Sequence, residues 1–511
     1  GFGFFHGLLG LFDLLGAAIG SVAVLFILSA LDEKGAVLAI SLISLAGGFI
    51  FSLGEKKWAN IIIIPLMAVI IISLYIYKPS VFDINISPYK GMMAAMRYPG
   101  AEHISTFRGP SSRVDIIKSP AIRYAPGLSL KYMDELPPQI GIAVDGGDLN
   151  AVTRFSGSRE AIRFIDFLPS SLPYAIGKNS NVLIMEPKGG LPVLTAVYYG
   201  SKNIDRIESN PVIIAAINSA FPDFSGGIYK ENTFTGLGRA WLKTRGSYDI
   251  IDISLTGILP WESGSFGISE EFMLTREAFV DYYQHLKQDG SLSITLYFLP
   301  PARTELRLLS TINSAMKEIG INDAYRRISV IRSWNTVTIL FKKGDLQPPD
   351  IAGIRKFAGE RNFDLVYYPG IREEESNIFN KLPNNDYFRI VSGIMDPAKY
   401  EAAVDGYLFD IAPVTDERPF FHHFLRVKNL FETYRLAGSK WQYFLEEGYL
   451  IPIILIQAIV LSVLLILLPL FKLVPEIFNR GKERRVVFSL QVFIYFSSIG
   501  LGFMFLEIAI I

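Results

Sequence analysis

The stretch NVLIMEPKGGLPVLTAVYYGSKNIDRIESNP, residues 181–211, combines residue types that can bind a nucleotide. Gly189 and Gly190 would let the backbone approach a ligand closely, and the helix expected after them offers free amide donors. Glu208 ends the next expected strand about 20 residues later, where a carboxylate can accept hydrogen bonds from both ribose hydroxyls. A structural interpretation stays open, in which the glycines only form a tight turn and Glu208 only caps a neighbouring helix. The turn is not a P-loop, because it lacks the GKS or GKT ending.

Other polar residues are candidates for binding or catalysis. Asp145 and Asp148 lie in AVDGGDLN on an expected turn, where they could bind a cationic amine or serve only the turn itself. His422 and His423 are adjacent, so on a strand they point to opposite faces, and no third ligand accompanies them. This pair therefore does not indicate a metal site. Ser254 lacks the G-x-S-x-G elbow, so hydrolase chemistry is unsupported.

The composition limits the classes of function. A chain of 511 residues is too long for one core and predicts two or three domains. Lys+Arg and Asp+Glu both number 49, so no net field would gather nucleic acid. The chain has no cysteine, which excludes disulfides, thiolate metal sites and cysteine nucleophiles. Its 50% hydrophobic content predicts a membrane component, and its two ends suggest truncation, with further helices outside the sequence.

Five apolar segments reach, or nearly reach, the roughly 20 helical residues that cross a hydrocarbon core. They are 8–30, 35–53, 59–77, 449–471 and 487–511. We expect the polar region between the third and the fourth to form a body held at a cell (inner) membrane. The short loops 54–58 and 472–486 are basic, and the positive-inside rule then slightly favours an extracytoplasmic body.

From residue 178 onward, strand and helix patterns alternate, which predicts a parallel sheet covered by helices on both faces. Short alternating runs with Gly and Pro before this point indicate a small β subdomain. The predicted domains are 1–77 with three transmembrane helices, 78–177 as a β-rich subdomain, 178–345 as a Rossmann-like domain, 346–448 as an α/β appendage, and 449–511 with two more transmembrane helices.

Eight stretches carry a family resemblance through their order and spacing. They are DLLGAAIGS (13–21), SPYKGMMAAMRYPGA (87–101), APGLSLKY (125–132), VLIMEPKGGLPVLTAVYYGSKNIDRIESNP (182–211), YDIIDISL (248–255), LTREAFVDYYQHLKQDGSLSIT (274–295), TDERPFFHHF (415–424) and LGFMFLEIAII (501–511). Nearly the whole chain thus resembles membrane-embedded spermidine synthase-like proteins, in which a transporter-like helical part is fused to a spermidine synthase domain. The resemblance implies an α/β fold with a class I methyltransferase-like (Rossmann-like) sheet and a preceding β subdomain, inserted between transmembrane helices. It also implies S-adenosylmethionine or decarboxylated S-adenosylmethionine as the ligand.

The resemblance further implies which residues bind that ligand. They are Glu186, Lys188, Gly189, Gly190, Glu208 and Gly238. The chain nevertheless departs from the family pattern at two binding positions. Soluble spermidine synthases carry an aspartate in the glycine-rich turn that holds the ligand's amine, and EPKGGLP has none. Their adenine-contacting aspartate is replaced here by Leu237.

The catalytic positions depart further from the family pattern. The enzymes carry an aspartate pair after the fourth strand, where one acid accepts the proton of the attacking amine, and Ser254 and Gly257 stand there in this chain. A serine cannot replace a carboxylate as general base without a partner. Asp252 could compensate, but a shift of two residues moves it about 6–7 Å along the strand. Asp252, Ser254 and Asp148 remain the candidates for catalysis.

These observations predict a multi-pass membrane protein with a domain that binds an S-adenosyl ligand. If active, it is a transferase of aminopropyltransferase- or methyltransferase-like type, although not an ordinary aminopropyltransferase. The alternative is a ligand-sensing or regulatory pseudoenzyme attached to a transporter-like bundle. The expected partners are the lipid bilayer, a polyamine or another amine substrate, and a second copy of the chain, with no nucleic acid and no metal.

Overall fold

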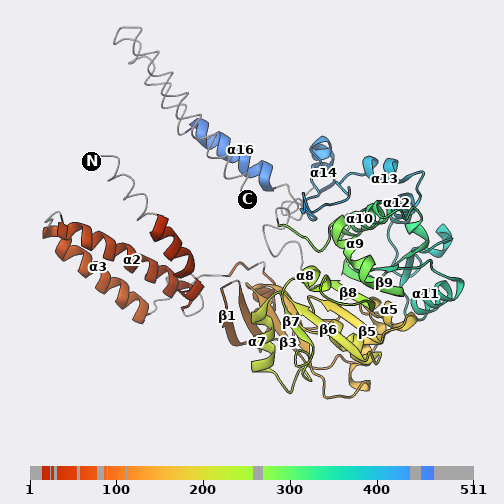
Figure 1. Ribbon diagram of the computed structural model, residues 1–511, viewed down its shortest axis with the longest axis horizontal. Helices are drawn as coiled ribbons and strands as arrows, with labels where there is room; N and C mark the ends of the chain where they lie inside the picture. Colours follow the sequence, from red (N-terminus) through yellow and green to blue (C-terminus); the bar gives the residue numbers. More distant parts are fainter. Residues whose placement is uncertain are drawn as a thin grey trace, which may run out of the picture. The chain divides into compact units, whose positions relative to one another are not determined.

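The computed structural model describes nine ranges of the chain, which are 14–23, 25–27, 31–54, 58–77, 86–88, 90–110, 112–256, 269–437 and 450–464. The chain divides into two compact units, Gly1–Glu447 and Gly448–Ile511. Figure 1 shows the described elements with their labels. Gly257 and the predicted span 487–511 lie outside the described residues.

The described residues of four apolar segments are helical, including 14–23 and 25–27 of the first one. In the first unit, α2 (Glu33–Gly54) and α3 (Trp58–Tyr77) contact each other, and the second unit contains α16 (Leu450–Ser462). Within the described ranges, no helix combines the length and the apolar content that crossing a membrane requires. This finding contradicts the predicted multi-pass location in a cell membrane. The expectation rested on the length and apolarity of the segments and on the family resemblance.

A four-stranded antiparallel sheet precedes the larger sheet, in the order β1-β2-β3-β4. Its strands are β1 (Glu102–Arg108), β2 (Arg113–Lys118), β3 (Gln139–Val144) and β4 (Gly147–Thr153), and the short α4 (Gly91–Met96) comes before them. The turn from β3 to β4 needs left-handed backbone, with φ of 51° at Asp145 and 75° at Gly146. Asp145 Oδ1 accepts a hydrogen bond from the backbone N–H of Arg113 at 2.9 Å. Asp145 therefore serves the turn, as the structural interpretation of this aspartate pair predicted.

The larger sheet has eight strands in the order β12-β10-β11-β9-β8-β5-β6-β7. These are β5 (Asn181–Met185), β6 (Asn203–Glu208), β7 (Thr233–Thr235), β8 (Tyr248–Leu255), β9 (Leu286–Tyr297), β10 (Ile328–Arg332), β11 (Thr336–Lys342) and β12 (Asp364–Tyr367). Strands β5 to β9 pair in parallel, whereas β11 pairs antiparallel with β9 and β10, and β12 with β10. The sheet is therefore mixed rather than wholly parallel, and the fold is α/β with a parallel core that fits a Rossmann-like methyltransferase fold.

Helices connect the strands, and local sequence accounts for several of their starts. The helices of this body are η2 (Glu160–Phe167), η3 (Pro169–Ser171), α5 (Leu172–Ile176), α6 (Leu191–Tyr198), α7 (Pro211–Ala220), α8 (Gly238–Leu242), α9 (Arg276–His285), α10 (Thr304–Glu318), η6 (Ala324–Arg326), α11 (Pro348–Glu360), η7 (Glu373–Glu375), α12 (Asp386–Met395), α13 (Tyr400–Gly406), η8 (Val427–Asn429) and α14 (Leu430–Ala437). Asn210 caps α7 by accepting from Val212 N, and Thr275 caps α9 by accepting from Ala278 N. Helix α9 ends at His285, because Leu286 already pairs with Tyr248 as part of β9.

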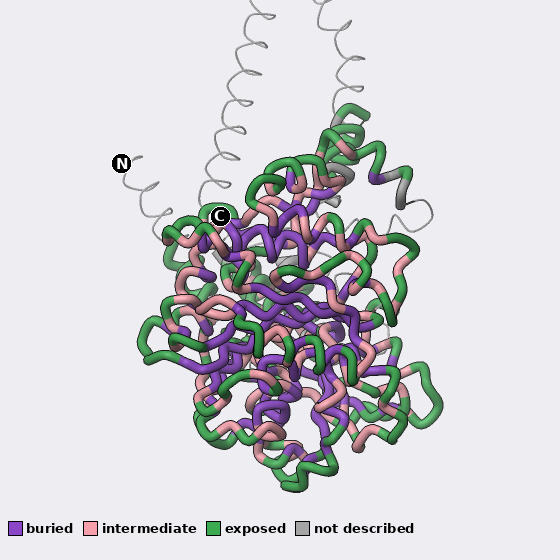
Figure 2. Tube along the Cα trace, turned by 90° about the vertical axis from the view of Figure 1, so that its right-hand side faces the viewer, coloured by how far each residue is buried: buried purple, intermediate pink, exposed green. Residues whose placement is uncertain are grey.

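One hydrophobic core joins the two sheets. It includes Val114 and Ile142 from the antiparallel sheet together with Val182, Ile184 and Ile250 from the parallel strands. In Figure 2 the buried segments run through the middle of this body and the exposed ones lie around it. Strand β8 is buried along six successive residues, which is the pattern of a strand covered on both faces. The shared core brings β4 close to the turn that follows β5.

Candidate active site at the switch point

The strand order reverses at β5, which pairs with β6 on one side and with β8 on the other. In open α/β sheets, ligands bind outside the carboxyl ends of the strands at such a switch point. A small pocket lies there. It is lined by Tyr124, Asn150, Glu186, Pro187, Lys188, Leu191, Pro192, Ser254 and Thr256. The pocket therefore draws its wall from the predicted turn, from the start of α6 and from the end of β8.

The turn after β5 is held in an uncommon backbone conformation. Glu186 and Lys188 have φ of 53° and 48°, in the left-handed region that side chains rarely adopt. Gly190 has φ of 87°, and a Cβ there would meet Ile228 Cδ1 at 2.1 Å. A Cβ on Gly189 would meet the backbone oxygen of Ala151 at 2.3 Å. Both glycines are thus required for packing inside the protein. Strained non-glycine residues are more frequent at functional sites.

Glu208 lies beneath this turn and is only 1% exposed. Its two carboxyl oxygens accept from Lys188 N at 3.0 Å and from Asn210 N at 3.1 Å. Burial, together with the neighbouring Glu186 carboxylate, raises the pKa of Glu208 to about 8. Glu208 therefore fixes the turn from behind and does not line the pocket, and its predicted role at the ribose stays a prediction.

Glu186 lines the pocket, whereas Glu208, for which the ribose contact was predicted, does not. Its carboxylate accepts from the N–H of Ser209 at 3.2 Å and from the Ser209 hydroxyl at 2.8 Å. The side chain is partly exposed and belongs to the lining of the pocket. Glu186 thus offers carboxylate oxygens toward a bound ligand, while Ser209 holds its orientation.

Lys188 and Asp148 come together although they are 40 residues apart in the sequence. Lys188 Nζ lies 2.6 Å from Asp148 Oδ2, with side chains only 15% and 22% exposed. Asn150 Nδ2 donates to Asp148 Oδ1 at 3.0 Å. The charge of Lys188 is thus already paired, which leaves Glu186 as the unpaired charge in the pocket wall.

The end of β8 contributes hydroxyl groups. Ser254 Oγ and Thr256 Oγ1 are 2.8 Å apart, and Tyr124 OH lies 3.2 Å from Thr256 Oγ1. The described end of this strand, from Ser254 to Thr256, offers hydroxyl groups and no carboxylate.

Asp252 lies deeper on β8 and is 2% exposed. Its Oδ2 accepts a hydrogen bond from Tyr174 OH at 2.7 Å. Burial raises the pKa of Asp252 to about 7, although the bond from Tyr174 acts in the opposite direction. Asp252 does not line the first pocket; it lines a second cavity beside it.

Gly238 begins α8 away from the pocket lining. A Cβ at this position would meet Met185 Sδ at 2.9 Å, so glycine allows α8 to pack closely against the end of β5. The preceding Leu237 is 71% exposed. The structure therefore gives Gly238 a packing role, and its predicted contact with a ligand stays a prediction.

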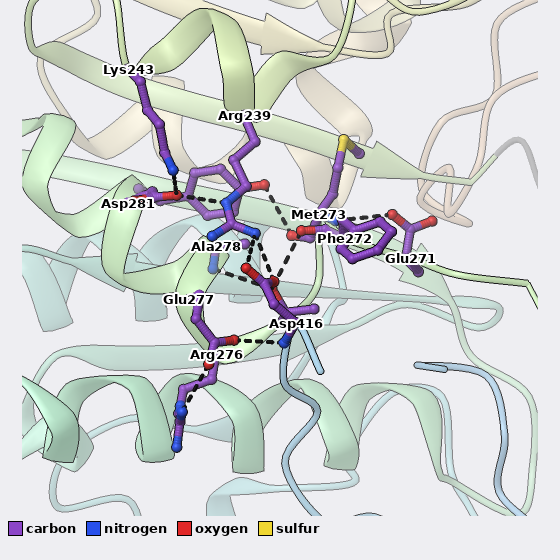
Figure 3. A network of polar contacts seen from close by, with 12 residues as sticks. Arg239, Lys243, Glu271, Phe272, Met273, Arg276, Glu277, Ala278, Asp281 and Asp416 are labelled. Carbon is purple, nitrogen blue, oxygen red and sulfur yellow. Dashed lines mark hydrogen bonds and ion pairs between the residues drawn. The ribbon is translucent and has the colours of Figure 1, made fainter. Parts of the chain in front are cut away.

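The next residue, Arg239, anchors a polar network that Figure 3 shows from close by. Arg239 Nε donates to Asp281 at 2.6 Å, and Nη1 donates to Asp416 at 2.7 Å. Thr275 Oγ1 also donates to Asp416, at 2.6 Å. Burial would raise the pKa of Asp416, but the bonds from Arg239 and Thr275 outweigh it and the pKa is lowered. The network joins α8, α9 and the TDERP segment, so the polar residues of this segment have a structural role.

Several residues of the pocket lining were not found from the sequence. Tyr124, Asn150 and Thr256 come from three segments that no local motif connects. His422, one of the adjacent histidine pair, is partly buried, and its removal from water lowers its pKa to about 3. The neutral imidazole is held among aromatic rings, with the ring of Phe421 centred 5.1 Å away.

The comparisons with known proteins found structures but no family. No protein-family model matches the sequence, and no curated protein matches it. The chain is similar to a spermidine synthase in complex with the transition state analogue AdoDATO, with 16% identity, a TM-score of 0.34, and coverage of 56% of this chain and 87% of that one. The Thermotoga maritima spermidine synthase matches with 17% identity, a TM-score of 0.34 and the same coverage.

A probable spermidine synthase from Corynebacterium glutamicum also matches, with 12% identity, a TM-score of 0.32, and coverage of 55% of this chain and 97% of that one. These TM-scores are too low for the likeness to carry an argument. The fold class therefore rests on the strand order, and the function has to be argued from the pocket.

Proposed function

We propose that the protein binds an adenosyl sulfonium, of the decarboxylated S-adenosylmethionine type, in the pocket at the switch point, and that it is a transferase. The observation that carries this proposal is the position of Glu186 in the wall of a pocket at the carboxyl ends of β5 and β8. Ribose hydroxyls are donors, and the two carboxylate oxygens of Glu186 can accept hydrogen bonds from them.

The charges around the pocket support a cationic ligand. Lys188 is neutralised by Asp148 at 2.6 Å, so the carboxylate of Glu186 leaves the wall negative. A sulfonium cation is attracted to such a wall, whereas the carboxylate of S-adenosylmethionine would add a second negative charge beside it. The decarboxylated ligand therefore suits the pocket better than S-adenosylmethionine.

The reaction class follows from what a sulfonium can do. An adenosyl sulfonium donates a carbon group to a nucleophile and leaves as a neutral thioether. The chain's own residues would bind the ribose through Glu186, hold the turn through Glu208 and orient the hydroxyls of Ser254 and Thr256 toward the reacting groups. Because Ser254 replaces the acid of ordinary spermidine synthases, we expect spermidine synthesis from butane-1,4-diamine to be absent or slower by about 10²–10⁴.

Calorimetric titration of the full chain tests the binding step. The ligands are decarboxylated S-adenosylmethionine, S-adenosylmethionine and methylthioadenosine, which has the nucleoside but no charge. We expect the decarboxylated ligand to bind more tightly than S-adenosylmethionine, and methylthioadenosine to bind measurably. Absence of heat with all three ligands would contradict the proposal.

A further inference from the structure

The second cavity shares a wall with the first. Leu191, Pro192, Ser254 and Thr256 line both of them. Because Ser254 and Thr256 carry short side chains that bond to each other at 2.8 Å, the two spaces are separated only by small groups. A molecule in the second cavity would therefore face the reacting end of a ligand in the first.

Of the described residues that line the second cavity, Asp252 is the ionisable one. It is almost fully buried, and Tyr174 OH holds one of its oxygens at 2.7 Å. Among the described residues, no lysine or arginine is recorded within ion-pair distance of this carboxyl group. A buried carboxylate without a cation is unfavourable, and an ammonium from a ligand would supply the missing partner.

Among the described residues, the rest of the lining holds no acid for a second positive charge. The other residues particular to this cavity are Pro126, Ser170 and Thr295, and the hydroxyl of Thr295 already bonds to Thr338 at 2.9 Å. The distal ammonium of a diamine would therefore lie against proline, leucine and hydroxyl groups. Burying an ammonium without an acid is strongly unfavourable, so the cavity discriminates against diamines.

We infer that the second cavity is the acceptor subsite and that it takes a primary monoamine, whose ammonium pairs with Asp252, rather than a polyamine. This inference rests on the proposed function, because it assigns the acceptor for the same sulfonium donor. The inference makes Asp252 a catalytic residue. It also explains how the chain could retain transfer chemistry although residue 254 is a serine and not an acid.

The transfer step balances with these groups. The ammonium gives one proton to the Asp252 carboxylate, and the freed lone pair of the nitrogen attacks the carbon bound to sulfur. The new C–N bond forms as the C–S bond breaks, with its electron pair going to sulfur. The products are a neutral thioether, a protonated secondary amine and a protonated Asp252, so the total charge is unchanged.

A ligand series on the unmodified full chain tests the inference first. The donor pocket is saturated with methylthioadenosine, and butylamine, butane-1,4-diamine and butan-1-ol are then titrated separately. We expect butylamine to bind about tenfold or more tightly than either the diamine or the alcohol. The inference is overturned if the diamine binds as tightly as butylamine, or if butylamine does not bind while methylthioadenosine does. Failure of methylthioadenosine itself to bind would instead refute the proposed function.

A pair of matched variants then assigns the effect to Asp252. Asp252→Asn keeps the shape and can still accept from Tyr174, but it removes the charge. Asp249→Asn is the control, since Asp249 lies on the same strand and binds Asn181 N and Lys287 Nζ instead. We expect Asp252→Asn to weaken butylamine binding about tenfold and to leave methylthioadenosine within about twofold, whereas the control changes neither. Unchanged butylamine affinity in Asp252→Asn would overturn the assignment, and the ligand series remains decisive if this variant does not fold.

Discussion

Lys188 Nζ lies 2.6 Å from Asp148 Oδ2, and this ion pair ties the turn after β5 to the start of β4. Neither side chain is more than 22% exposed, so each charge would be left partly buried without the other. The antiparallel sheet therefore takes part in building the candidate site, and the pair gives a direct way to measure that coupling.

We expect Lys188→Met and Asp148→Asn each to lower the free energy of unfolding by about 1–3 kcal/mol, because each leaves a partly buried charged group without its partner. The double variant should lose less than the sum of the two, by about 1 kcal/mol. Urea denaturation of the four proteins measures this coupling. Additive losses in the double variant would show that the pair contributes nothing of its own.

Glu186→Gln should weaken the binding of methylthioadenosine by about 1–3 kcal/mol, because the ribose hydroxyls lose an acceptor that carries charge. The midpoint of thermal unfolding should change little, since Glu186 is partly exposed. Calorimetry on the full chain measures the affinity. Glu102→Gln, at an exposed residue of β1, is the matched control and should bind as the unmodified protein does.

Glu208→Ala should differ from Glu186→Gln in a recognisable way. The substitution leaves the N–H groups of Lys188 and Asn210 without their acceptors, so it should reduce stability as well as ligand affinity. If Glu208→Ala lowers affinity while stability stays unchanged, Glu208 contacts the ligand directly and the sequence-based role is correct.

Stability should fall as the pH rises from about 5 to 8. Burial raises the pKa of Asp252 to about 7 and that of Glu208 to about 8, both above the values of these groups in an unfolded chain. Between pH 5 and 8 these two acids keep protons in the folded protein that the unfolded chain has lost, so their contribution is present at low pH and lost at high pH. The lowered pKa of His422 acts in the opposite direction up to about pH 6.5, over a narrower range than the two acids. For Asp252 the loss is about 2–3 kcal/mol as an upper value.

Urea midpoints at pH 5 and pH 8 test this dependence. The ion-paired Asp416 has a lowered pKa, so its contribution is lost only in more acidic solution and does not mask the trend. Asp252→Asn should make the difference between the two midpoints smaller. Stability that increases toward pH 8, or an equal difference in Asp252→Asn, would contradict the assigned burial of this acid.

Asp416→Asn should lower the free energy of unfolding by about 2 kcal/mol, because hydrogen bonds from Arg239 and Thr275 lose a charged acceptor. Asp386→Asn offers the same change at a side chain that is 70% exposed and should alter stability by less than about 0.5 kcal/mol. Chemical denaturation of both variants makes the comparison. Equal losses of unfolding free energy in the two variants would show that the network in Figure 3 does not stabilise the fold.

Much of the parallel core could be read from the sequence. The runs NVLIM and YDIIDISL are strands β5 and β8 as expected, since short runs rich in β-branched apolar residues indicate buried strands, even with the two aspartates of the second run. The antiparallel placement of β11 between β9 and β10 could not be predicted, because the pattern of side chains along a strand carries no information on its direction. The length and apolarity of segments likewise led to a membrane location that the structure contradicts.

The candidate site could be read only in part. The turn 186–192 was found because glycine and helix-start signals are local, but two acids close to it compete for the ribose, and only the structure places Glu186 in the wall. The pairs Lys188–Asp148 and Tyr174–Asp252 join residues 40 and 78 positions apart. Such contacts are set by the packing of whole elements, which spacing along the sequence does not encode.

Hydrogen exchange of the full chain, measured with and without saturating methylthioadenosine, tests the binding site most directly. We predict slower exchange at the backbone amides of 186–192 and 254–256, which lie at the two sides of the pocket, with no change in β1 and β2. Protection confined to other segments, or unchanged exchange at 186–192 under saturating ligand, would contradict the placement of the adenosyl site at the switch point.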